Sequence, residues 1–141
     1  MVKKQLVSMK VSEGGRLLQA LDSSEYPVNS ALWFLSEDEE WRLILATPLV
    51  DSEGPRSAYE NLQRFLSTSS PDYDITLEEV SLLSPRHALF EVFRRAIVTG
   101  PGVSEIRFTE SSVDNLFIED ALVYRIAANP DWTPQGPVTT P

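Results

Sequence analysis

Two carboxylates that could bind a metal ion stand two residues apart, at Asp51 and Glu53. They follow a predicted strand and precede a predicted helix, which is where open α/β sheets position ligand groups. With Asp120, or its neighbour Glu119, contributed from the last predicted strand, they could hold Mg²⁺, which prefers oxygen ligands. Acidic residues before a helix more commonly cap its N-terminus and stabilise its dipole, and we favour that role here. A small Mg²⁺-dependent hydrolase or phosphotransfer enzyme using Asp51, Glu53 and Asp120 is therefore the alternative hypothesis.

The single histidine, His87, lies four residues before Glu91 in a predicted helix. Side chains at this spacing meet on a helix surface, so Glu91 could orient His87 as a general base. The local sequence offers no obvious nucleophile for such a base to activate. We therefore expect His87 to be a solvated residue, and we predict no catalytic residue.

Three arginines surround a Gly-Pro-Gly segment at residues 100–102, with Arg94 and Arg95 before it and Arg107 after it. Guanidinium groups beside a glycine-rich backbone can bind phosphate or carboxylate, so these residues are a candidate anion site. Arginines in a last helical turn are also expected from the helix dipole, and Gly-Pro-Gly ends a helix. Helix termination is the interpretation that we favour.

Four consecutive acidic residues form the densest charge in the chain, and tryptophans flank them. The acidic residues are Glu37, Asp38, Glu39 and Glu40, and the flanking aromatics are Trp33 and Trp41. An acidic loop of this kind could dock a basic partner surface. A solvated hairpin tip that protects the sheet edges from pairing would have the same composition.

Charge and composition exclude several function classes. The formal net charge is −9, and the first ten residues hold three lysines and no acid. The remaining 9 arginines and 21 acidic residues give the rest of the chain a charge of −12. This field repels phosphate backbones, so nucleic-acid binding is not expected. A P-loop is excluded because lysine does not occur after Lys10.

Cysteine is absent and histidine occurs once, which removes disulfides, Cys-based zinc sites and multi-histidine metal sites. We predict no cofactor and, in the absence of disulfides, a cytoplasmic location. No run of 18 apolar residues occurs, so no membrane-spanning helix is expected, and the N-terminus lacks a signal-peptide core.

The secondary structure of residues 2–22 is ambiguous between a helix and a strand. Their apolar residues follow a helical period, and a helix is our prediction. Alternation over residues 7–12 would instead fit a half-buried strand, and Gly14-Gly15 could break the helix.

Apolar periodicity, with turn and capping signals, defines the remaining elements. We predict a hairpin of strands at 31–36 and 41–47, a helix beginning at Pro55, a helical turn at 76–79, a strand at 80–83, a helix from the Ser84-Pro85 cap to Gly100, and strands at 104–109 and 116–127. A bulge or kink is expected at Glu119-Asp120, where charge interrupts the apolar run.

The order is α-β-β-α-β-α-β-β, which predicts one layered α/β domain over residues 1–128 with a mixed sheet of about five strands and three helices. Crossover connections allow the strands on either side of each later helix to be parallel. Residues 129–141 contain four prolines and few apolar residues, so we predict a flexible tail that folding does not need.

These observations favour a non-catalytic module that binds a protein with a basic surface, such as an accessory, immunity-like or antitoxin-like protein. The oligomeric state stays open, because no pattern in the sequence bears on it.

Overall fold

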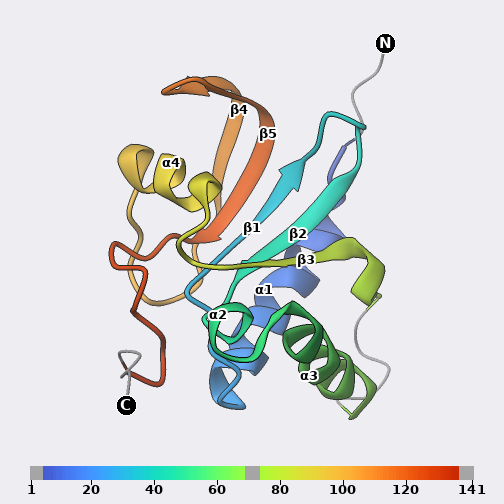
Figure 1. Cartoon of the computed structure of the whole chain (residues 1–141). Coiled ribbons are helices and arrows are strands. Elements are labelled where there is room, and N and C mark those ends of the chain that lie inside the picture. Colours follow the sequence, from blue (N-terminus) through green and yellow to red (C-terminus); the bar gives the residue numbers. More distant parts are fainter. Residues whose placement is uncertain (1–4, 69–73, 137–141) are drawn as a thin grey trace.

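The computed structural model describes residues 5–68 and 74–136, and they form a mixed α/β fold built on one five-stranded sheet (Figure 1). Its elements are α1 (Ser8–Ser23), β1 (Ser30–Leu35), β2 (Trp41–Ala46), α2 (Leu49–Glu53), α3 (Pro55–Thr68), a 3₁₀ turn η1 (Leu77–Glu79), β3 (Val80–Leu83), α4 (Ala88–Ala96), β4 (Ile106–Val113) and β5 (Leu116–Arg125). This confirms the predicted fold class and order. The short helix α2 was not predicted, because it buries no residue and so carries no apolar period.

The strand order is β3-β2-β1-β5-β4, and only β2 and β3 are parallel. The predicted parallel crossover through α3 is therefore confirmed. The one through α4 is wrong, because the chain crosses to the far edge and β4 there pairs antiparallel with β5. The hairpin connection between β4 and β5 sets the direction of β4.

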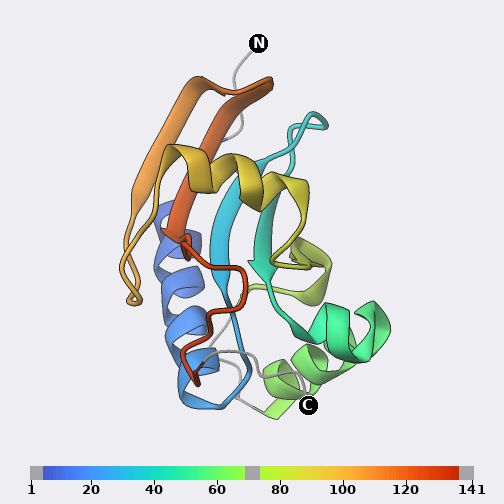
Figure 2. The same ribbon diagram turned by 60° about the vertical axis from the view of Figure 1, so that its left-hand side comes forward.

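Helices cover both faces of the sheet, and Figure 2 shows α4 lying across one of them. On the other face α1 and α3 bury leucines against the odd-numbered residues of β1 and β2, and on the α4 face Phe90 and Phe93 are fully buried. No helix in the described ranges is long and apolar enough to cross a membrane.

Helix α1 runs without a break through Gly14-Gly15, so the predicted helix is confirmed from Ser8 onward and the strand alternative is wrong. Residues 5–7 of the predicted helix are not helical, and residues 2–4 lie outside the described residues. Gly14 is buried, and a Cβ atom there would lie 2.4 Å from the Tyr124 hydroxyl and 2.8 Å from Trp33 Nε1. Glycine thus lets α1 lie directly on the sheet, and this packing offsets its low helix propensity.

The predicted kink at Glu119-Asp120 is present. Thr109 pairs with Asp120 and Ser111 with Ile118, but the ladder lacks the pair between them and Glu110 there has φ 43°. Ile118 and Ala121 consequently pack in the same core cluster although they are an odd number of residues apart.

Residues 129–136 lie against the body, whereas the sequence predicts that they form part of a flexible tail. The Asn29 side-chain amide donates to the carbonyls of Asn129 (3.0 Å) and Trp132 (2.7 Å). The Trp132 ring lies 5.3 Å from the Arg125 guanidinium. Asn29 precedes this segment by about 100 residues, so composition alone does not reveal the contacts. Residues 137–141 lie outside the described part of the chain.

Replacing Gly14 with Ala should lower the free energy of unfolding by about 2 kcal/mol, because the new methyl group collides with Tyr124 and Trp33 in a packed core. Gly15→Ala is the matched control. Its Cβ would meet Tyr124 and Val103 at 3.6 Å, an ordinary contact, so this change should raise stability by up to about 1 kcal/mol. Urea melts of both variants test this, and equal effects would contradict the assigned packing.

A chain that ends at Ala128 should lose about 2 kcal/mol of stability, because the buried Asn29 amide loses both carbonyl acceptors and Arg125 loses its aromatic cover. A thermal melt should show a Tm about 5 °C lower. A chain ending at Gly136 keeps these contacts and is the control. An unchanged Tm for the shorter chain would show that the contacts contribute nothing.

Candidate functional site

The acidic turn between β1 and β2 projects its side chains into solvent. Ser36 N–H donates to the Glu40 carbonyl and Glu39 N–H donates to the Ser36 carbonyl, both at 2.9 Å. Glu39 takes the positive φ of 61° that closes this short connection. All four side chains, from Glu37 to Glu40, are exposed. The hairpin predicted from the sequence is therefore confirmed, with its carboxylates on a backbone fixed by hydrogen bonds.

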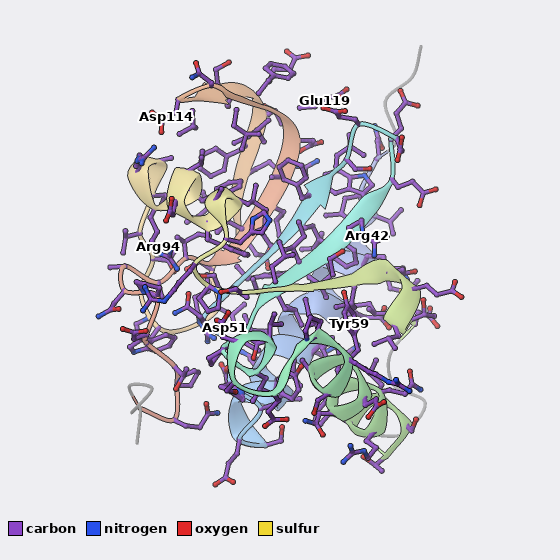
Figure 3. The ribbon with its side chains drawn as sticks, in the orientation of Figure 1. Arg42, Asp51, Tyr59, Arg94, Asp114 and Glu119 are labelled. Carbon is purple, nitrogen blue, oxygen red and sulfur yellow. The ribbon has the colours of Figure 1, made fainter. Side chains whose placement is uncertain are left out.

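The antiparallel pairing of β1 with β5 brings two more carboxylates to the same end of the sheet. Ala121 pairs with Phe34, so Glu119 continues along β5 toward the acidic turn, as Figure 3 shows. Glu110 occupies the position opposite Glu119 on β4 and is exposed. We call Glu37, Asp38, Glu39, Glu40, Glu110 and Glu119 together the acidic end. Sequence reasoning missed Glu110. It could have been found from the two predicted hairpins. If they pair with each other in antiparallel fashion, both of their turns lie at the same end of the sheet, and charged residues near either turn lie there too.

The two tryptophans beside the acidic turn have different roles. Trp33 is only 1% exposed, and its Nε1 donates to the Tyr124 hydroxyl at 2.9 Å, so it belongs to the core and a partner has no access to it. Trp41 is half-buried, and the Arg107 guanidinium lies 5.8 Å from its ring centroid. Both side chains lie on the same face of the sheet, so position along the strands decides this difference. Trp33 lies within β1 under α1, whereas Trp41 is the first residue of β2, next to the acidic turn.

The predicted anion site divides into three separate contacts. Arg94 donates to the Ala127 carbonyl at 2.8 Å, and burial lowers the pKa of its guanidinium. Arg95 forms an ion pair with Asp114 at 2.5 Å. In Figure 3 Arg94 lies on one side of α4 and Asp114 on the other. Each guanidinium thus stabilises a different junction between elements.

Arg107, the third of these arginines, donates to both carboxylate oxygens of Asp120, at 2.6 and 2.7 Å. This hydrogen bonding raises the pKa of Arg107, and Asp120 is only 2% exposed. This bidentate ion pair joins β4 to β5 next to the acidic end, and the Arg107 guanidinium also lies near the Trp41 ring.

The three carboxylates of the alternative metal site have separate partners. Asp51 accepts from the Ser84 hydroxyl at 2.8 Å, and Glu53 accepts from Ser57 at 2.9 Å and from Asn61 at 3.1 Å. These are contacts between side chains, in place of the backbone caps that the sequence favours. Within residues 5–68 and 74–136, no three His, Asp or Glu side chains gather so that they could hold a metal ion.

His87 is the N-cap of α4, and its Nδ1 accepts from the Leu89 N–H at 3.1 Å. The sequence predicts Ser84 as the cap, but the chain makes one more turn first, with His87 N–H donating to the Ser84 carbonyl. Ser84 Oγ instead accepts from the Arg86 N–H at 3.1 Å. The imidazole therefore caps the N-terminus of α4, a role that the four-residue spacing between His87 and Glu91 does not predict.

Replacing His87 with Ala should destabilise the protein by about 1 kcal/mol, because the first turn of α4 loses a hydrogen-bond acceptor. His87→Asn should retain most of the stability, since its side-chain oxygen can accept the same bond. Urea denaturation measures both. If the two variants are equally stable, the cap contributes nothing.

Comparison of the chain with family models, with curated proteins and with solved structures gives no match. The site is therefore assigned from side-chain geometry and charge.

Proposed function

We propose that this protein is a non-catalytic interaction module whose acidic end docks a basic surface of another protein. The observation that carries the proposal is that strand pairing brings Glu110 and Glu119, from a second hairpin, to the same end of the sheet as the four exposed carboxylates of the acidic turn. An immunity-like, antitoxin-like or accessory role fits such a surface. The absence of cysteine supports a reducing, cytoplasmic setting for the complex.

The charge of the whole molecule reinforces this surface. Residues 11–141 carry −12, so a basic partner is attracted at long range before it makes contact. The acidic end then supplies the densest local charge and orients the approach. Charges at the rim of an interface act mainly on the rate of association and on specificity.

Rigidity supports a docking role as well. The acidic turn is closed by two backbone hydrogen bonds, and the Arg107–Asp120 pair joins β4 to β5, the strands that carry Glu110 and Glu119. A surface that is ordered before binding loses less conformational entropy on association. Phe117, near the start of β5, is 60% exposed at the same end and offers apolar contact area beside the charges.

The alternative hypothesis, a Mg²⁺-dependent hydrolase or phosphotransfer enzyme, requires three carboxylates that converge, and among the described residues these three do not. Its Asp51, Glu53 and Asp120 side chains bind Ser84, Ser57 with Asn61, and Arg107, respectively.

The combined change Asp38→Asn, Glu39→Gln and Glu40→Gln should slow association with the partner about tenfold at low ionic strength, because it weakens electrostatic steering. The partner is first captured from a native extract on the immobilised full chain at low salt and eluted at high salt. Association and dissociation of the purified partner are then measured with the parent and the variant. The difference should shrink as salt rises.

A control variant with Glu60→Gln, Glu78→Gln and Glu91→Gln changes the net charge by the same amount at exposed positions outside the acidic end. It should slow association much less. If both variants slow binding equally, total charge and not the acidic end drives association, and the assignment of the surface is wrong. Binding that is as fast for the acidic-end variant as for the parent would also contradict it.

A further inference from the structure

A cavity of about 250 Å³ lies at the other end of the sheet, between the loop that follows α4 and the segment that follows β5. One wall is formed by residues 98–101 and the other by residues 127–129, with Arg125 and Trp132 completing it. Because β5 runs from the acidic end to Arg125, the two sites lie at opposite ends of that strand. The choice of a free ligand over a side chain of the partner rests on the proposed function, whereas the cavity itself is described without it.

Hydrogen bonds hold both walls in place. Thr99 N–H donates to the Ile126 carbonyl and Ile126 N–H donates to Thr99 Oγ1, each at 3.0 Å. The second wall is fixed by the Asn29 amide, which donates to the Asn129 and Trp132 carbonyls. The cavity is therefore formed before any ligand arrives, and these backbone groups are already used within the protein. What remains for a ligand is mainly apolar surface from side chains such as Val98 and Pro101.

The charge of Arg125 is compensated inside the protein. Its side chain is 1% exposed and donates to both carboxylate oxygens of Asp22, at 3.1 and 2.6 Å, and to the Val28 carbonyl at 3.1 Å. The remaining face of the guanidinium is near the Trp132 ring. With its charge balanced in this way, Arg125 gives the cavity no preference for an anionic ligand.

We infer that this cavity binds a small uncharged aromatic molecule of one or two fused rings. An enclosed apolar cavity of roughly 150 Å³ accommodates benzene. This cavity is open to solvent on one side, and its volume of about 250 Å³ leaves room for a somewhat larger ring system. The Trp132 indole offers an aromatic surface for ring packing, and apolar walls favour an uncharged ligand. A free molecule is preferred over a side chain of the partner, since one docked surface would have to reach both ends of β5.

Titration of the ¹⁵N-labelled full chain with indole tests the inference by NMR. Indole should cause saturable shifts of the Trp132 Nε1–H signal and of the Thr99 and Ala127 amides. Val98 is 52% exposed at the cavity, so Val98→Trp should fill the space while the protein still folds. This variant should bind indole at least about tenfold more weakly, the loss expected when a fitting apolar group is excluded.

Val7→Trp is the matched control, because Val7 is similarly exposed (54%) but lies at the start of α1 and does not line the cavity. It should bind indole as the parent does. Shifts that do not saturate, shifts outside the cavity, or full binding by Val98→Trp would each overturn the inference. Shifts produced only by the protein partner and not by indole would overturn it too, since they would assign the cavity to a side chain.

Discussion

Two consecutive residues of β5 seat the first helix on the sheet, and most of the structure depends on that contact. The register between β1 and β5 shifts by one residue, since Ala31 pairs with Arg125 but Leu32 pairs with Val123. Tyr124 is the extra residue of β5 at this shift. Both Tyr124 and Arg125 consequently reach α1. The Tyr124 hydroxyl donates to the Val11 carbonyl, and Arg125 binds Asp22 near the other end of the helix. The extra residue of a β-bulge thus anchors one helix at both ends.

This contact requires α1 to lie close to the sheet, and Gly14 allows it because a larger residue there would collide with Tyr124 and Trp33. Burial raises the pKa of the Tyr124 hydroxyl, which therefore stays protonated and able to donate. Trp33 donates to the same oxygen, so α1, β1 and β5 meet at one hydrogen-bonded point inside an apolar core. Since an unsatisfied buried polar group is costly, this point also fixes the register of the two central strands. That register in turn sets which residues emerge at each end of the sheet.

The two ends differ in chemistry for this reason. At one end the acidic turn exposes its four carboxylates, and at the other Arg125 is enclosed by Asp22 and Trp132. The first arrangement leaves charge available to a partner, whereas the second uses its charge internally and leaves an apolar cavity. A rigid sheet separates them, so a change at one end need not disturb the other.

The sequence by itself determined the local features. Apolar periods located α1, α3 and most of the strands, and the charged pair Glu119-Asp120 located the kink, because each signal acts over a few residues. The predicted strand at 104–109 was too short, since β4 extends to Val113, and the predicted helix end at Gly100 was wrong, since α4 ends at Ala96. The acidic turn at residues 37–40 was visible for the same reason. Only the tertiary structure decided that Trp33 is core, that His87 and not Ser84 caps α4, and that Glu110 and Glu119 join the acidic turn. It also decided that residues 129–136 pack on Asn29 and Arg125. These outcomes depend on strand order, register and contacts between segments about 100 residues apart, as between Asn29 and Trp132, and a local pattern carries no information about such pairings.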